Sequence, residues 1–168
     1  MERLKETIEI IRLMWTQSPA TYQGKYCHIR DAYCEPKPRE KIPILIGGDG
    51  RAALRVVAKF ADAWNEVGRM DIFRPAYEKL RQTCLEEGRD VSKITLTCVV
   101  HPSFPENRSD FKQNEWNTLM GPSVDGVAEE LYSLHKLGVS HFQVRVDDVT
   151  SLNTFCDEVI PQVKQETT

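Results

Sequence analysis

The chain has 168 residues, of which 40% are hydrophobic and 28% charged, and its formal net charge is -3. These values are typical of an ordinary globular domain with a real core. The negative charge argues against a nucleic-acid partner, because such a protein needs a basic surface to neutralise phosphates. No apolar run approaches the roughly 20 residues of a membrane span, and the charged N-terminus is unlike a secretory signal, so we expect a cytoplasmic protein without membrane association.

The cysteines and histidines do not form a metal-binding pattern. The five cysteines are widely spaced and include no CxxC pair, and His28, His135 and His141 are not spaced as ligands, so we assign no metal. In a reducing compartment, free cysteines are most simply small buried residues. Cys84 and Cys156 fall on apolar helical stripes, which favours that interpretation.

Residues 1–41 are expected to form a helix followed by an extended insertion segment. Apolar residues recur at helical spacing over residues 2–16. Residues 21–26 predict two short extended pieces around a glycine turn. The two prolines of residues 35–38 exclude a helix and predict an extended run.

Residues 42–168 are expected to form four βα units within a single domain. Short apolar runs alternate with amphipathic helical patterns, which indicates a parallel sheet. Gly88 and Gly138 follow two of the helical patterns and predict their ends. An open doubly wound sheet and part of a barrel both fit this order. The expected strands are 42–46, 61–65, 94–100 and 141–146; the expected helices are 51–61, 72–87, 124–137 and 152–163; a polar loop covers about 102–115.

The segment after the first expected strand carries the strongest chemical signal. Gly47, Gly48 and Gly50 lie between that strand and a helix. Glycines allow positive φ and close approach, and a helix N-terminus attracts phosphate, so the pattern predicts an anion site to which Arg51 adds charge. Asp49 opposes this unless it caps the helix and points away. A tight turn without a ligand is the alternative, and the segment is neither a GxGxxG fingerprint nor a P-loop.

Several blocks of the sequence, in this order, resemble the luciferase-like monooxygenases and their deazaflavin-dependent relatives. The resemblance extends over essentially the whole chain, including Gly121-Pro122-Ser123 and Leu137-Gly138-Val139 near the C-terminus. The other matching blocks are Ile11-Arg12-Leu13-Met14-Trp15-Thr16, Tyr22-Gln23-Gly24-Lys25-Tyr26, Glu35-Pro36-Lys37-Pro38, Ile42-Pro43-Ile44-Leu45-Ile46-Gly47-Gly48 and Ala58-Lys59-Phe60-Ala61-Asp62-Ala63-Trp64-Asn65.

The resemblance implies a (β/α)8 TIM barrel, of which this chain would supply the C-terminal half. It also implies FMN or a deazaflavin (coenzyme F-420) as cofactor, with the cofactor phosphate held at Gly47 and Gly48. By the same match, Trp64, Asn65 and Gly68 fall near the ring or the substrate; without that match, Trp64 would be taken as a core residue. Such a barrel needs about 250 residues and eight strands, so the chain is expected to be a fragment or a half-barrel that assembles with a partner.

Two polar residues near strand ends are candidates for contact with a small-molecule substrate. His101 and Arg145 lie near the C-terminal ends of the third and fourth expected strands, where barrel enzymes place their chemistry. An arginine can bind an anionic substrate. Alternatively, Arg145 pairs with Asp147 or Asp148 at the rim, and His101 is an ordinary loop residue.

The sequence thus leads to two functional hypotheses. The first is a flavin- or deazaflavin-dependent oxidoreductase of the luciferase-like class, and the second is a non-catalytic half-barrel that binds cofactor or is purely structural. In either case the open sheet is expected to form a homodimer or higher oligomer through its free edges. It would also present an apolar face toward the barrel centre, for which the candidates are Ile44, Ile46, Leu96 and Val144.

Overall fold

A parallel sheet forms the centre of the structure. The computed structural model describes residues 1–114 and 118–166. Strands β3 (Leu45–Gly47), β4 (Ala63–Val67), β5 (Thr95–Pro102) and β7 (Val139–Val144) lie in this order and run parallel. The four predicted βα units are therefore present, and each strand lies beside the next one along the chain.

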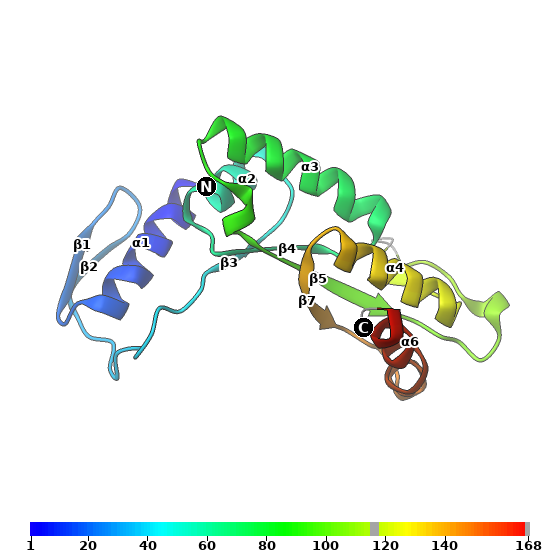
Figure 1. The fold of residues 1–168 in the computed structure, drawn as a ribbon. Coiled ribbons are helices and arrows are strands. Elements are labelled where there is room, and N and C mark those ends of the chain that lie inside the picture. The colour runs from blue at the N-terminus through cyan, green and yellow to red at the C-terminus, as the bar shows by residue number, and fades with distance from the viewer. Residues whose placement is uncertain (115–117, 167–168) are drawn as a thin grey trace.

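Three helices cover one side of this sheet (Figure 1). They are α2 (Arg51–Phe60), α3 (Met70–Glu86) and α4 (Val124–Lys136). Gly88 and Gly138 follow α3 and α4 with φ of 66° and 108°, the left-handed conformation that a helix-ending glycine supplies. Between the helices and the sheet lies one hydrophobic core, whose largest fully buried members include Leu54, Trp64, Phe73, Leu80, Met120 and Leu134.

The strand positions differ from the predicted ones by a few residues. The side chains that face the helices also differ from the expected ones. Strand β3 begins at Leu45 rather than Ile42. Side chains alternate along a strand, and Ile46 and Leu96 are buried in the core beneath the helices, with Ile44 packed against that core. The prediction that these three residues face the barrel centre is therefore wrong. Val144 is 44% exposed, but it pairs with the core residue Val100 and so lies on the helix side of the sheet as well.

The opposite side of the sheet, here called the open face, is more polar than expected. Within the described residues, no helix covers it in Figure 1. Alternation from the buried positions assigns side chains from all four strands to this face. They include Leu45 on β3, Asn65 and Val67 on β4, Thr97, Val99 and His101 on β5, and His141 and Gln143 on β7.

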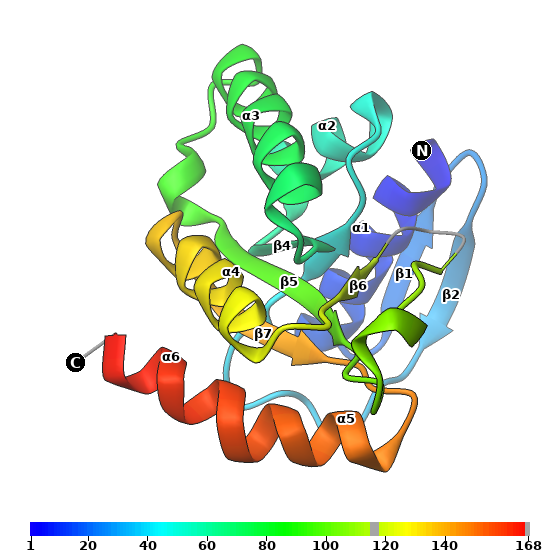
Figure 2. The same ribbon diagram turned by 90° about the vertical axis from the view of Figure 1, so that its right-hand side faces the viewer.

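The N-terminal segment forms a helix and a hairpin that lie beside each other (Figure 2). Helix α1 (Glu2–Thr16) is followed by the antiparallel strands β1 (Ala20–Gln23) and β2 (His28–Ala32). The carboxylate of Glu6 accepts hydrogen bonds from three successive backbone N–H groups at the hairpin turn, at 2.9, 2.9 and 2.7 Å. The turn is thereby fixed to the helix.

The last third of the chain contains shorter elements. They are η1 (Val91–Lys93), η2 (Arg108–Asp110), β6 (Leu119–Met120), α5 (Val149–Thr154), the π-helical segment η3 (Phe155–Val159) and α6 (Ile160–Glu166). Residue 115, at the end of the expected polar loop, lies outside the described residues. Phe155 and Val159 are buried as predicted, but Cys156 is exposed, because the wider π turn shifts the phase of the apolar stripe.

Among the helices described, none combines the length and the apolar composition needed to cross a membrane.

Gly68 offers a test of the packing between β4 and β5. Its N–H donates to the Val99 carbonyl at 2.7 Å. A Cβ at this position would lie 2.6 Å from Val100 and 2.9 Å from Cys98. We therefore expect Gly68→Ala to lower the free energy of unfolding by about 1–3 kcal/mol through overpacking, measured by urea denaturation. Gly126→Ala, inside helix α4 with its Cβ no closer than 3.5 Å to a neighbour, should instead be neutral or stabilising by about 0.5–1 kcal/mol. Equal effects of the two substitutions would contradict the packing argument.

Candidate functional site

The carboxyl ends of the parallel strands meet at one edge of the sheet, and most of the predicted site residues lie there. Gly47 is the last residue of β3, and the loop that follows contains Gly48 and Gly50. Asn65 pairs with Gly47 in the neighbouring strand. His101 lies near the end of β5, and Arg145 directly follows β7. Edges of this kind are where parallel α/β proteins bind their ligands.

Two hydrogen bonds from β4, here called the loop clamp, fix the glycine loop. The Gly48 N–H donates to the Asn65 carbonyl at 3.2 Å, and the Trp64 indole N–H donates to the Gly48 carbonyl at 3.0 Å. Gly48 has φ of 103°, which an L side chain rarely adopts. Both backbone groups of Gly48 are thus already hydrogen-bonded, so Gly48 shapes the loop and is not a free donor to phosphate as the sequence suggested.

The free donors lie two to four residues further on, at the start of α2. Gly50 is the N-cap and has no side chain to cap the helix. The N–H groups of Gly50, Arg51 and Ala52 have no partner among the described residues, as expected for the first turn of an uncapped helix. No atom lies within 4 Å of a Cβ built at Gly50. This uncovered set of N–H groups fits a phosphate group.

Charges around the loop are arranged so that they do not oppose an anion. Asp49 does not cap α2; its carboxylate pairs with Lys79 of α3 at 2.8 Å. Arg51 is exposed and has no ion-pair partner among the residues described. A cleft of about 480 Å³ opens beside the loop, between Arg51, Arg55 and Lys79. The negative charge of Asp49 is therefore offset, and Arg51 remains available to an anionic ligand.

Trp64 and Gly68 act within the protein rather than on the open face. Trp64 is completely buried, with its ring 5.3 Å from that of Phe73 and 6.5 Å from that of Tyr77. It supports the loop from beneath, which replaces the expected position near a cofactor ring. Gly68 is enclosed by β5 side chains. The structure therefore explains both residues by packing.

Asn65 differs from these two because its side chain lies on the open face. Its Oδ1 accepts a hydrogen bond from the Thr97 hydroxyl at 2.8 Å. The amide Nδ2 has no partner among the described residues and can donate to a ligand above the sheet. Asn65 is the predicted pocket residue whose placement is best suited to contact one.

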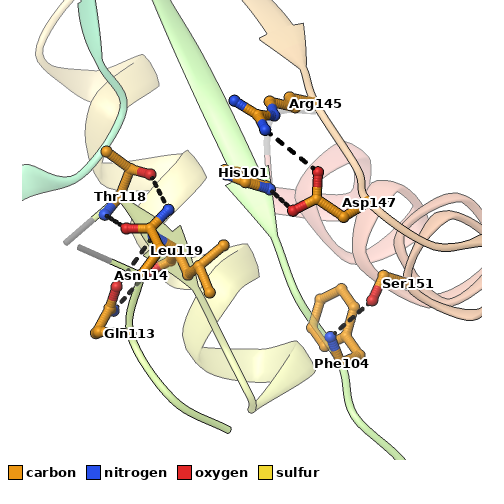
Figure 3. Close-up of polar contacts among 9 residues, drawn as sticks. All are labelled: His101, Phe104, Gln113, Asn114, Thr118, Leu119, Arg145, Asp147 and Ser151. Atoms are coloured by element: carbon orange, nitrogen blue, oxygen red, sulfur yellow. Dashed lines mark hydrogen bonds and ion pairs between the residues drawn. The ribbon is translucent and has the colours of Figure 1, made fainter. Parts of the chain in front are cut away.

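His101 and Arg145 meet at the carboxylate of Asp147 (Figure 3). His101 Nε2 lies 2.8 Å from Asp147 Oδ2, and Arg145 Nη2 lies 3.5 Å from Asp147 Oδ1. The alternative pairing of Arg145 with Asp147 is therefore present, although Arg145 remains largely exposed. Asp147 joins the two predicted residues, and no sequence pattern indicated that a residue so distant from His101 would contact it.

Glu66 is a further residue that sequence analysis did not single out. Its Oε1 accepts from the Val67 N–H at 2.8 Å, whereas its Oε2 is buried without a partner. Burial, and secondarily the negative charge of Asp49, raise the pKa of Glu66, against a lowering by the Val67 N–H and Lys79. A charged residue within the otherwise uncharged segment Ala63–Val67 was the available signal.

Comparison with known proteins identifies the family. The family model described as luciferase-like monooxygenase matches residues 1–121. The chain therefore belongs to the luciferase-like monooxygenase family, as its sequence blocks suggested.

Curated relatives carry names of deazaflavin-dependent enzymes. An F420-dependent glucose-6-phosphate dehydrogenase of Nakamurella multipartita is 36% identical over 118 residues, which are 67% of this chain and 34% of that protein. One from Kineococcus radiotolerans is 24% identical over 136 residues, covering 79% of this chain and 40% of that protein. The chain thus spans less than half the length of these relatives.

Solved structures confirm the α/β fold with its parallel sheet. The F420-dependent tetrahydromethanopterin reductase of Methanopyrus kandleri superposes with a TM-score of 0.76 at 15% identity, covering 96% of this chain and 63% of that one. DmoA of Hyphomicrobium sulfonivorans gives 0.72 at 14% identity, covering 99% and 55%. Identities this low establish the fold, and the match corresponds to part of a luciferase-like barrel.

Glu66 generates a prediction about stability and pH. Because its pKa is raised on folding, the protonated form is favoured in the folded chain, and stability is lost as pH rises through the folded pKa. We expect Glu66→Gln to raise the free energy of unfolding at pH 7 by about 1 kcal/mol, since it removes a partly buried charge of which one oxygen lacks a hydrogen-bond partner.

The gain should disappear near pH 4, where Glu66 is itself protonated. Urea denaturation at both pH values measures the difference, and Glu106→Gln, at an exposed position, serves as the control. A Glu66→Gln gain that is the same at both pH values would show that burial of the charge is not its cause.

Proposed function

We propose that this chain binds the phosphate of FMN or a deazaflavin at the start of α2, as part of a luciferase-like oxidoreductase. The observation that carries the proposal is the uncapped helix start, where the N–H groups of Gly50, Arg51 and Ala52 are free beside a loop that β4 holds rigid. The names of the deazaflavin-dependent relatives support the cofactor class.

Each residue of the loop contributes differently to such a site. The first-turn N–H groups donate to phosphate oxygens, and the positive end of the α2 dipole and the Arg51 guanidinium favour the negative charge. Gly47 and Gly48 have no side chains, so a ligand can approach the backbone of this segment closely. The bound cofactor supplies the redox chemistry, while Asn65 offers an amide donor above the open face.

Binding and turnover assays on the purified chain distinguish a chain that turns over a small-molecule substrate by itself from one that only binds cofactor. Titration of the purified chain with FMN, followed by fluorescence quenching, and a parallel titration with the deazaflavin measure binding. Assays of the oxidation of reduced FMN and of the reduced deazaflavin measure turnover. Binding with turnover supports the oxidoreductase, binding alone supports a cofactor-binding half-barrel, and neither supports a purely structural module.

Gly48→Val tests the phosphate assignment. The substitution places a β-branched side chain at φ of 103° and displaces the loop from its clamp. We expect the affinity for FMN or the deazaflavin, whichever the wild-type chain binds, to fall at least tenfold, or about 1.4 kcal/mol. Circular dichroism should show that the fold is retained. Gly88→Val also places a β-branched side chain at positive φ, 66° at the end of α3, and should leave affinity unchanged. An unchanged affinity in folded Gly48→Val would rule out the assignment.

We also propose that the chain assembles into a homodimer or higher oligomer. Within the described residues, β3 pairs only with β4, and β7 pairs only with β5, so both edges of the sheet are free. Leu45 is 45% exposed on edge strand β3. Unpaired edges next to exposed apolar side chains favour association.

Sedimentation velocity at micromolar concentration should show a species larger than the 19.3 kDa chain, with an interface above about 1,200 Å². Leu45→Lys places a charge at the free edge and should shift the equilibrium toward monomer. Leu85→Lys, at a 74% exposed position on α3, should not. A wild-type chain that remains monomeric throughout the concentration range contradicts the assembly.

A further inference from the structure

We propose that His101 and Asp147 form an acid–base pair in which Asp147 is a positioning residue and His101 Nδ1 exchanges a proton with a hydroxyl-bearing ligand. This inference rests on the proposed function, because the ligand is the substrate that would lie over the open face. The pair is drawn in Figure 3, where His101 from β5 meets Asp147 from the segment after β7.

The position of His101 in the sheet is the first argument. Val100 is a fully buried core residue on the helix side, so alternation places the His101 side chain on the open face. His101 is the second-last residue of β5, and it pairs with Leu119 of β6. Side chains that face inward at the carboxyl ends of barrel strands are the ones that reach a substrate.

The hydrogen-bonding state of the imidazole is the second argument. His101 Nε2 lies 2.8 Å from the Asp147 carboxylate, which can only accept, so Nε2 carries the proton. The other ring nitrogen, Nδ1, then holds a lone pair. It has no hydrogen-bond partner among the described residues and is not completely enclosed, although His101 as a whole is only 5% exposed. An unpaired acceptor that is not sealed within the core is available to a donor on a ligand.

Asp147 is held in place by a set of contacts that do not involve His101. The Arg145 N–H donates to the Val100 carbonyl at 2.9 Å. Asp148 caps α5 through the Ser151 N–H at 2.7 Å, and the Ser151 hydroxyl accepts from the Phe104 N–H at 2.9 Å. These bonds tie the segment to β5 on both sides of Asp147. Its carboxylate is therefore preorganised to orient the ring.

The proton transfer balances without a redox partner. The O–H bond of the ligand breaks, a bond forms between Nδ1 and the proton, and the electron pair stays on the ligand oxygen. The resulting imidazolium is stabilised by the neighbouring carboxylate of Asp147. The arrangement suits a ligand that presents a hydroxyl group. The nearby Arg145 guanidinium lies 3.5 Å from Asp147 but is largely exposed, so it can also attract an anionic substituent.

The tautomer of His101 tests the pair on the chain without any cofactor. Long-range ¹H–¹⁵N correlation spectra distinguish Nε2–H from Nδ1–H. We expect the Nε2–H form of wild-type His101 to exceed the other at least about tenfold, since a charge-assisted hydrogen bond is roughly twice as strong as a neutral one. The ratio should fall several-fold in Asp147→Asn and approach that of the exposed His141 in Asp147→Ala, while the temperature of unfolding stays near that of wild type.

Arg145→Gln is the matched control, because it removes the neighbouring charge but leaves the His101–Asp147 contact. It should keep the wild-type tautomer ratio. A dominant Nδ1–H form in the wild type, or an unchanged ratio in Asp147→Ala, would overturn the proposal. Cofactor titrations of the same variants keep the two proposals separate, since failure of the phosphate site would appear as absent binding in wild type and would leave the spectra unaffected.

Discussion

The loop clamp is the interaction on which the candidate site depends. A glycine at positive φ is conformationally permissive, and a loop of three glycines among four residues would otherwise sample many states. Trp64 and Asn65, consecutive residues of β4, bind the carbonyl and the N–H of Gly48. Because Trp64 is anchored by Phe73 and Tyr77 of α3, the core of the domain sets the position of the helix start that faces the ligand.

The same strand separates structural from chemical residues by alternation. Trp64 and Glu66 point to the helix side, whereas Asn65 points to the open face. On β5, Cys98 and Val100 are core residues, and Thr97 and His101 occupy the opposite face. The candidate chemistry is thereby confined to one surface. The loop clamp at one end and Asp147 at the other are each fixed by backbone contacts rather than by the ligand.

The order of helices and strands could be predicted from the sequence, because it follows from the local spacing of apolar residues and from the glycines that end helices. Gly88 and Gly138 end their helices as expected. Facing was harder, because the continuous apolar run Ile44-Leu45-Ile46 shows no alternation of apolar and polar residues from which its two faces could be told apart. In the structure Ile46 lies in the core with Ile44 packed against it, and Leu45 lies on the open face.

Within the candidate site, features formed by neighbouring residues could be predicted, and contacts between distant residues could not. The glycine loop was found because its residues are consecutive. The contact of His101 with Asp147 joins residues 46 apart, and the free N–H groups depend on how the loop is bonded, so neither could be read from a pattern. Trp64 was placed near the cofactor through family resemblance, whereas its residue type alone favours the core position that it occupies.

The contact between Glu6 and the hairpin turn has a consequence for the motions of the N-terminal segment. Backbone N–H groups in a surface turn usually exchange with solvent deuterium quickly, since nothing protects them. Here the N–H groups of Lys25, Tyr26 and Cys27 all donate to one carboxylate on α1. They become exposed to exchange only when the helix and the hairpin separate. The turn therefore belongs to the same cooperative unit as the helix, despite its position at the surface.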